Sequence, residues 1–397
     1  MTVDAPLMTY DFISPRKIVF GRGRSQEIGQ IGRSLGDCCF IVCGSKTLTE
    51  NGILDNLSQR LHEAGVALLG THTISREPEV EDVDHVSTIV RVFGLKGRTF
   101  IMGLGGGSAM DLAKAVAAMA VNHETDTVAD YLEGVGKGLT IKNDPLPVLA
   151  VPTTAGTGAE ATKNAVISSY DPLFKKSLRD ERLLPRIALV DPELTMSATR
   201  EVTVASGMDA ITQLIESYIS RRSQPIPCAL AEQGLTLAMP SILEVVEDGR
   251  WRPAREAMSQ AALLSGLCLA NSGLGMAHGV AAALGVHCRV PHGLACAMML
   301  PVALRSNISV CTSELAQLGR VVLHISPELS ETKTAEKFVE EIESIGRQLG
   351  VPSRLSELGV PADKIPEIVK SSQGNSMRGN PRQFTEEELT AILESVQ

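Results

Sequence analysis

A few aspartate, glutamine and histidine side chains in the second half of the chain have the types and spacing of a metal site. Asp209 and Gln213, in the stretch GMDAITQLIE, are four residues apart and leave the same face of a predicted helix. His278, His287 and His292 crowd into one short stretch of a chain that has only eight histidines. Catalytic zinc or iron needs about three nitrogen or oxygen ligands and an open position. We expect Asp209, His278 and His292 to supply them, and a helical core with hydrogen-bonded histidines is the alternative.

A glycine run in the first half, GLGGGSAMDLAK, is predicted to join a strand to a helix. Gly105, Gly106 and Gly107 let the backbone approach a ligand closely, and Ser108 is predicted to cap the helix that follows. The helix N-terminus then favours a phosphate group. The spacing departs from GxGxxG and lies about 100 residues into the chain, so a glycine-rich turn without a ligand is the alternative.

A second glycine-rich turn, VPTTAGTGAEATKNAVI, carries the hydroxyl groups of Thr153, Thr154, Thr157 and Thr162. Hydroxyls and free backbone amides suit a phosphate or ribose. Ligands bind outside the carboxyl ends of parallel strands, so two such turns in one sheet favour a polar cofactor.

The elements that must position these residues fall into two halves. Short apolar strands alternate with helices up to about residue 194, which predicts a parallel sheet covered by helices on both faces. The remaining chain has helical spacing almost throughout. We therefore predict an α/β domain at 1–194 and an all-helical domain at 195–397, with a site in the cleft between them. The predicted strands are 17–21, 38–44, 66–71, 99–107, 146–154 and 186–194. The predicted helices are 46–64, 79–95, 108–122, 202–221, 228–247, 253–270, 273–285, 334–349 and 385–396.

Composition excludes several classes of protein. The formal net charge of the 397 residues is -9 without a basic cluster, which argues against binding to nucleic acid or an anionic membrane. Eight scattered cysteines without a CxxC pair are typical of thiols in a reducing compartment. The N-terminus is not that of a signal peptide, and the apolar runs are too short for a membrane span. We expect a soluble cytoplasmic protein.

Several blocks in order along nearly the whole chain make it resemble the iron-containing (group III) alcohol dehydrogenases. The blocks are PRKIVFGRG, GGGSAMDLAK, VPTTAGTGAEATKNAVI, LLPRIALVDPEL, GMDAITQLIES, GLGMAHGVAAALG, VPHGLACAMMLP and GNPR. The resemblance implies a Rossmann-like N-terminal domain and a helical C-terminal domain, as in the dehydroquinate synthase-like architecture. It also implies reversible hydride transfer between NAD(P) and an alcohol or aldehyde.

The resemblance also assigns residues to the site by position. Asp111 is implied at the nicotinamide end with a catalytic role. Asp209, His278 and His292 match three ligands of a divalent iron or zinc ion. The residues implied to bind the cofactor are Gly44, Gly105, Gly106, Gly107, Ser108, Asp111, Thr153, Thr154, Thr157, Thr162, Asn164, Lys175 and Leu194.

Two positions depart from the family pattern in the same pocket. The family's fourth ligand is a histidine four residues after the aspartate, and this chain has Gln213, a neutral and weaker oxygen donor. The family has a pocket histidine one turn after His278, and this chain has Ala282. The proton must then leave by water, by the ribose hydroxyls or by His287. Three readings stay open: a metal retained with water or Gln213 as fourth ligand, a metal-independent carbonyl reductase resembling maleylacetate reductases, or a nucleotide-binding homologue with impaired catalysis.

The preference between NAD and NADP, the substrate and the oligomeric state are predicted from fewer residues. Family members that prefer NAD often carry an aspartate after the second strand, where this chain has Gly44, Ser45 and Lys46. The absence of an acid makes NADP acceptable, and we lean slightly to NADP over NAD. A small aliphatic alcohol or aldehyde is the expected substrate, and the family implies a homodimer or a larger assembly.

Overall fold

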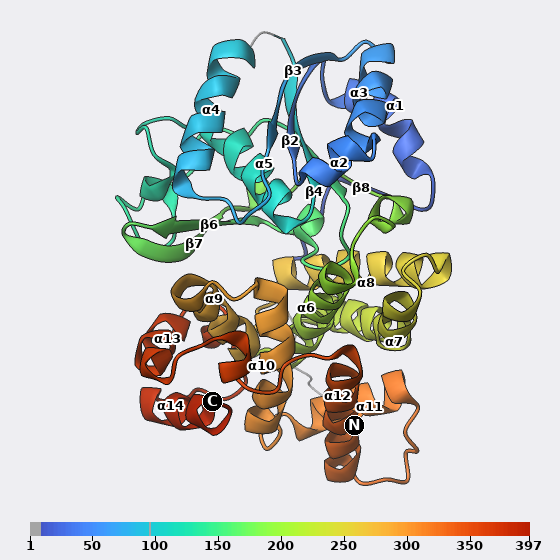
Figure 1. The fold of residues 1–397 in the computed structure, drawn as a ribbon, viewed down its shortest axis with the longest axis vertical. Helices are drawn as coiled ribbons and strands as arrows, with labels where there is room; N and C mark the ends of the chain where they lie inside the picture. The colour runs from blue at the N-terminus through green and yellow to red at the C-terminus, as the bar shows by residue number, and fades with distance from the viewer. Residues whose placement is uncertain (1–8, 95–96) are drawn as a thin grey trace.

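The protein folds into an α/β domain followed by a helical domain, as the sequence predicts (Figure 1). The computed structural model describes residues 9–94 and 97–397. Within these residues, one parallel sheet has the strand order β1-β8-β5-β4-β2-β3. Its strands are β1 Lys17–Phe20, β2 Cys38–Cys43, β3 Ala67–Thr73, β4 Thr99–Gly105, β5 Val148–Pro152 and β8 Ile187–Val190. All six were predicted as short apolar runs.

Helices cover both faces of this sheet, because alternate residues of the central strands are apolar on both sides. Along β2, Phe40 and Val42 pack with the helices on one face, whereas Cys39 and Ile41 pack with those on the other. Figure 1 shows α4 and α5 on one side and α1 to α3 on the other. The bounds are α1 Ile28–Leu35, α2 Lys46–Glu50, α3 Ile53–Glu63, α4 Val80–Gly94 and α5 Gly107–Met119. The predicted helix over 46–64 is broken at Asn51 and Gly52, and α1 was not predicted.

An antiparallel hairpin extends from the α/β domain toward the helices and was not predicted from the sequence. Its strands are β6 Asn164–Tyr170 and β7 Leu173–Arg179. Short 3-10 turns complete this half: η1 Arg24–Glu27, η2 Val128–Tyr131, η3 Ala159–Ala161, η4 Glu181–Leu183 and η5 Pro192–Thr195. The last strand ends at Val190 and the next long helix begins at Arg200. The change from alternating strands and helices to helices alone therefore falls between these residues.

The second half is helical, and the six helices predicted there are present. The bounds are α6 Arg200–Ile219, α7 Pro225–Glu247, α8 Arg252–Asn271, α9 Met276–Cys288, α10 His292–Asn307, α11 Thr312–Leu323, α12 Glu331–Leu349, η6 Ser356–Leu358, η7 Ala362–Lys364, α13 Ile365–Ser372, η8 Met377–Gly379 and α14 Glu386–Ser395. Three further helices, α10, α11 and α13, were not predicted. Helix α6 lies in the centre of this domain with its residues from Gly207 to Ile219 buried.

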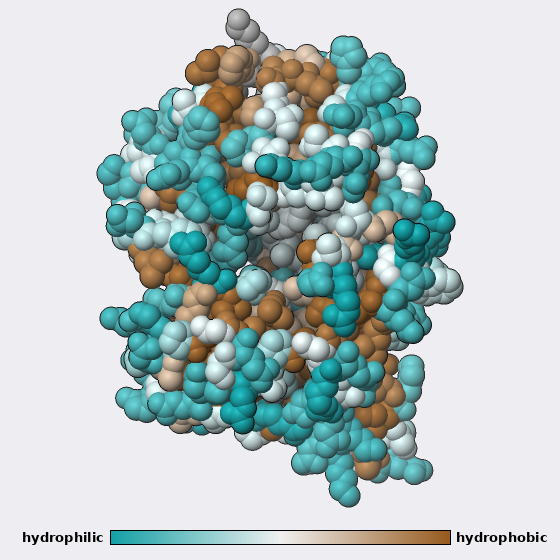
Figure 2. All heavy atoms as spheres, viewed as in Figure 1, coloured by the Kyte–Doolittle hydropathy of each residue, from teal (hydrophilic) through white to brown (hydrophobic). Residues whose placement is uncertain are grey.

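Helix α7 is the one described helix that is long and apolar enough by composition to cross a membrane. It packs in the same core as α6 and α8, where Ala231, Leu235 and Ile242 are fully buried. A buried core helix passes such a test of length and hydropathy as readily as a membrane span. Figure 2 shows a surface on which hydrophilic side chains prevail over the outer parts of both domains.

The two domains meet at the second glycine-rich turn, residues 152–162, which we call the threonine loop. Gly156 faces α6, where an added Cβ would lie 2.6 Å from Ser206 Cβ. Gly158 faces α8, where an added Cβ would lie 2.5 Å from the carbonyl oxygen of Ala262 and closer still to Gly266. The loop backbone therefore packs directly on both helices with no room for side chains between them.

Candidate functional site

The sheet brings the two predicted cofactor turns into contact. In the ladder between β4 and β5, Gly105 pairs with Pro152, so the glycine run and the threonine loop leave the sheet from neighbouring positions. A Cβ added to Gly106 would lie 3.2 Å from Thr154 Oγ1, and one added to Gly107 would lie 2.9 Å from Thr157 Oγ1. The two threonines thus stand over the glycines at the carboxyl edge of the sheet, where ligands bind in such folds.

The N-terminus of α5 is built differently from the prediction. Gly106 is the N-cap residue, no side chain accepts a hydrogen bond from the first turn, and Ser108 lies inside the helix. The prediction that Ser108 caps α5 was wrong, because the N-cap residue is Gly106, two residues earlier. The uncapped amides at this end remain available for an anionic ligand.

Close packing explains why the first residue after the second strand is a glycine. A Cβ on Gly44 would lie 2.9 Å from the Cα of Gly105, which has a φ of +151° that favours glycine. A side chain at position 44 would therefore displace the backbone of the glycine run. Leu194, another predicted cofactor residue, is buried in the core of the α/β domain.

A buried lysine joins the threonine loop to α5. The Lys114 ammonium lies within 2.9 Å of Asp111 Oδ1 and donates hydrogen bonds to Thr162 Oγ1 (2.9 Å), to the Ala159 carbonyl (3.1 Å) and to the Asn164 carbonyl. The second oxygen of Asp111 accepts a hydrogen bond from the Val166 amide. Thr162, Asn164 and Asp111, all predicted near the cofactor, thus form a rigid support beneath the threonine loop.

Three predicted ligands and one cysteine converge in the helical domain. Asp209 comes from the middle of α6, His278 from the first turn of α9, and His292 and Cys296 from the first two turns of α10. One donor atom of each lies within 4.8 Å of the donor atoms of all the others. His292 is the first residue of α10, a helix that was not predicted, and it directly follows Pro291.

The geometry of this cluster fits a divalent metal. Asp209 Oδ1 and His278 Nε2 lie 3.2 Å apart, both are buried, and neither makes a hydrogen bond within the described residues. Leaving buried polar atoms without partners is costly, which indicates that another group satisfies them. Burial lowers the pKa of His292, which keeps its imidazole neutral and able to bind a metal.

Glu216 orients His278 from the far side of its ring. Its Oε2 lies 2.7 Å from His278 Nδ1, and its Oε1 accepts a hydrogen bond of 2.6 Å from the Ala277 amide. This contact directs His278 Nε2 toward Asp209, the arrangement that commonly supports a metal-binding histidine. Glu216 follows Asp209 by seven residues on the same face of α6, which is a spacing that the sequence analysis did not use.

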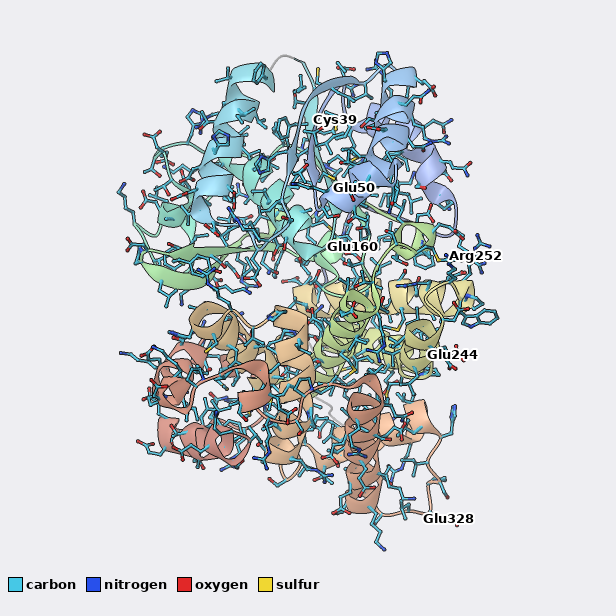
Figure 3. The ribbon with its side chains drawn as sticks, viewed as in Figure 1. Cys39, Glu50, Glu160, Glu244, Arg252 and Glu328 are labelled. Atoms are coloured by element: carbon cyan, nitrogen blue, oxygen red, sulfur yellow. The ribbon has the colours of Figure 1, made fainter. Side chains whose placement is uncertain are left out.

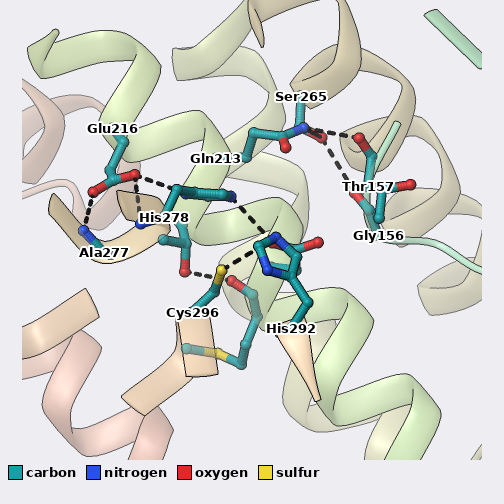
Figure 4. Close-up of polar contacts among 12 residues, drawn as sticks. Gly156, Thr157, Gln213, Glu216, Ser265, Ala277, His278, His292 and Cys296 are labelled. Atoms are coloured by element: carbon teal, nitrogen blue, oxygen red, sulfur yellow. Dashed lines mark hydrogen bonds and ion pairs between the residues drawn. The ribbon is translucent and has the colours of Figure 1, made fainter. Parts of the chain in front are cut away.

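Gln213 is directed to the threonine loop. Its Nε2 donates to the Thr157 carbonyl and to Ser265 Oγ, each at 3.0 Å. Figure 4 shows Gln213 extending toward Thr157 and Ser265, whereas His278, His292 and Cys296 face one another. Gln213 therefore links α6, α8 and the threonine loop.

A cavity of about 730 Å³ lies between the hairpin, α9 and α13. Ala282, one turn after His278 on α9, lines it together with Val286, Phe174, Lys175 and Ser371. Lys175, predicted to contact the cofactor, is nearly buried and forms an ion pair of 2.6 Å with Glu77. The methyl group of Ala282 leaves this wall apolar, one turn along α9 from His278.

His287 lies at the end of α9 beside the same cavity. Its Nε2 is 2.7 Å from the hydroxyl of Ser371, which lines the cavity, and its Nδ1 is 3.5 Å from the exposed Glu367 carboxylate. The three side chains connect the cavity wall with solvent. Neither Ser371 nor Glu367 stood out in the sequence.

Comparison with known proteins decides the family. The family model for iron-containing alcohol dehydrogenase matches residues 15–192, and the model for the C-terminal part of the Fe-containing alcohol dehydrogenase family matches residues 203–397. The chain belongs to the iron-containing alcohol dehydrogenase family. It is 29% identical to an NAD-dependent methanol dehydrogenase of Bacillus methanolicus over 98% of this chain and 100% of that protein. It is 32% identical to alcohol dehydrogenase 4 of Saccharomyces cerevisiae over 96% of this chain and 97% of that protein.

Solved structures of iron-containing alcohol dehydrogenases share the fold. A crystal structure of 1,3-propanediol oxidoreductase superposes with a TM-score of 0.91 at 29% identity, over 98% of this chain and 100% of that chain. This member of the family is therefore an oxidoreductase acting on CH–OH groups, an alcohol dehydrogenase or aldehyde reductase with small-molecule substrates. The family uses NAD(H) and a divalent metal. The predicted fold class and reaction class are confirmed.

Proposed function

We propose that the protein interconverts a small aliphatic alcohol and its aldehyde, with the nicotinamide cofactor and a divalent metal held where the two domains meet. The observation that carries the proposal is the buried pair of Asp209 Oδ1 and His278 Nε2, which face each other 3.2 Å apart and make no hydrogen bond to any other described residue. His292 closes the group from α10. These three side chains would hold the ion, which polarises a substrate oxygen when bound.

The α/β domain provides the nucleotide site in this proposal. Gly106, Gly107 and Ser108 present backbone amides at the N-terminus of α5 to the pyrophosphate, and Thr154 and Thr157 supply hydroxyls from above. Gly44 and Gly105 keep the floor of the site free of side chains. Asp111, held by Lys114 and the Val166 amide, fixes the position of α5 relative to the nicotinamide end.

The proton leaves by a route that does not need a histidine at position 282. The Ser371 hydroxyl takes the proton from the cavity and passes it to His287, whose other nitrogen faces Glu367 and solvent. His287 suits this role because an imidazole exchanges protons near neutral pH. Ala282 meanwhile leaves room for the aliphatic part of the substrate against α9.

Elemental analysis of the purified protein, with an aldehyde-reduction screen using NADH and NADPH, tests the proposal. We expect about one divalent ion per chain in the active wild type, and loss of both metal and turnover in Asp209→Ala and His292→Ala. Gln213→His should raise iron or zinc affinity when the imidazole turns from the threonine loop toward Asp209, and an unchanged affinity would show that position 213 stays directed away from the ion. Activity without metal would favour the metal-independent reductase, and nucleotide binding without any turnover would favour the impaired homologue.

The proposal also covers the preference between NAD and NADP, the oligomeric state and the cellular location. The residues after the second strand are Gly44, Ser45 and Lys46, and the packing of Gly44 against Gly105 leaves no room for a side chain at position 44. The lack of an acid that would repel a 2′-phosphate supports acceptance of NADP as well as NAD. We further propose a cytoplasmic homodimer or larger homo-oligomer. Ratios of kcat/KM for the two nucleotides and light scattering of the purified protein test these points.

A further inference from the structure

The buried thiol of Cys296 lies in the metal cluster and was not singled out by the sequence analysis. Cys296 follows His292 by four residues on α10, so both side chains leave the same face of that helix. Its Sγ is 3.7 Å from His292 Nε2 and lies within 4.8 Å of the donor atoms of Asp209 and His278. Cys296 is fully buried, so the sulfur faces the cluster and not solvent.

Three of the six donor–donor separations in the cluster are close to those of a tetrahedral site, and the other three are at most 4.8 Å. Zinc bonds of about 2.0–2.3 Å to oxygen, nitrogen and sulfur place neighbouring ligand atoms roughly 3.3–3.6 Å apart. Asp209 Oδ1 lies 3.2 Å from His278 Nε2 and 3.9 Å from His292 Nε2, and His292 Nε2 lies 3.7 Å from Cys296 Sγ. Side-chain movements of up to about 1 Å around an ion would bring the four donors to bonding distance.

Gln213 is engaged elsewhere. Both hydrogen bonds of its Nε2 lead to the threonine loop and to α8, on the far side from Cys296 (Figure 4). Moving the amide into the cluster would break them and leave Ser265 Oγ and the Thr157 carbonyl without this donor. On α10, Cys296 follows His292 by four residues and has its sulfur in the cluster. On α6, Gln213 follows Asp209 by four residues, but its amide nitrogen is bound to the threonine loop and α8.

We propose that Cys296 is the fourth protein ligand of the metal, so that the ion is held by one carboxylate, two imidazoles and one thiolate. The inference rests on the metal site proposed above. The sulfur binds as a thiolate, and its proton passes to solvent when the ion enters. A thiolate donor favours zinc or cobalt over iron, in contrast with a site of oxygen and nitrogen alone. Catalytic zinc sites keep or open a position for substrate, so a substrate oxygen would share the ion with these four side chains.

Cobalt spectroscopy of the full-length protein tests the assignment without an activity assay. The protein is stripped of metal, reloaded with one equivalent of Co²⁺ and examined by absorption. We expect visible bands of a tetrahedral ion together with a near-ultraviolet sulfur-to-cobalt charge-transfer band. The charge-transfer band should disappear in Cys296→Ser, and the Zn²⁺ dissociation constant, measured by competition with a chromogenic chelator, should rise about tenfold or more.

Cys311→Ser is the matched control, because Cys311 is also a buried thiol on this side of the fold and donates to the Asn307 carbonyl, which a serine can also do. It should keep the charge-transfer band. Visible cobalt bands without the charge-transfer band in the wild type would overturn the assignment of Cys296 and leave the proposed metal site intact. No cobalt binding by the wild type would overturn both. The wild-type spectrum decides the question even where Cys296→Ser fails to fold.

Discussion

Glu160 in the threonine loop makes the stability of the protein depend on pH. Its carboxyl is 2% exposed and lies where the two domains meet (Figure 3). Burial raises its pKa from 4.5 to about 7, and the nearby Lys114 ammonium opposes this shift only in part. We predict that Glu160→Gln flattens the pH dependence of unfolding between weakly acidic and weakly alkaline solution.

The size of the effect follows from the two pKa values. The unfolded chain releases this proton near pH 4.5 and the folded chain near pH 7, so the unfolded chain binds fewer protons in between. The free energy of unfolding therefore falls as pH rises, with no penalty below pH 4.5 and the full penalty above pH 7. At about 1.4 kcal/mol for each pKa unit, the full penalty is about 3 kcal/mol. About 2 kcal/mol of it develops between roughly pH 5 and pH 8.

Urea unfolding of wild type and Glu160→Gln at several pH values measures the effect. The absolute stability of the variant also contains the cost of placing an amide in this site, so the informative quantity is the difference between the two proteins as a function of pH. Glu244→Gln, which changes an exposed carboxylate on α7, serves as the control and should track the wild type. A difference between wild type and Glu160→Gln that stays constant across this range would refute the reasoning.

Further predictions concern the metal, the domain contact and the proton route. Glu216→Gln should weaken Zn²⁺ binding by about 10- to 100-fold in a chelator competition, because it removes the charge that orients His278; an unchanged dissociation constant would contradict this. Gly158→Ala should destabilise the protein by about 1–3 kcal/mol in chemical unfolding, since its φ is +59° and the new Cβ would meet α8. Gly346→Ala on α12, where no atom lies within 4 Å of the added Cβ, should instead stabilise by up to about 1 kcal/mol. His287→Gln should lower kcat for alcohol oxidation about tenfold or more, and added imidazole buffer should restore part of it; a rate insensitive to the substitution would exclude this proton route.

The sheet and most helices could be predicted because burial leaves a clear pattern in the sequence. The central strands are covered on both faces and therefore appear as unbroken apolar runs, such as CCFIVC at β2. The β6–β7 hairpin was missed because its second strand, LFKKSLR, is polar and only partly buried. Helix α10 was missed because Pro291 and Gly293 flank His292 and resemble a turn, although proline is common just before the first helical residues.

The site could be predicted only as far as residue type and order allow. Asp209, His278 and His292 were found because their types match metal ligands, and the structure places them together. Cys296 shares the four-residue spacing to His292 that drew attention to Gln213, but it lay among apolar neighbours typical of an inert thiol. The orientation of Gln213 could not be predicted, because it depends on Ser265 and the Thr157 carbonyl, which come from other parts of the chain.

The contact between Gly158 and Gly266 limits how this enzyme can be recombined with its relatives. In the sequence the threonine loop lies within the α/β domain, but its backbone packs directly against helix α8 of the helical domain. A chimera that joins this α/β half to another helical half needs a residue without a side chain at the position of Gly266, or the loop is displaced. The two halves are therefore not interchangeable modules, and a substitution on α8 can displace the threonine loop of the other half.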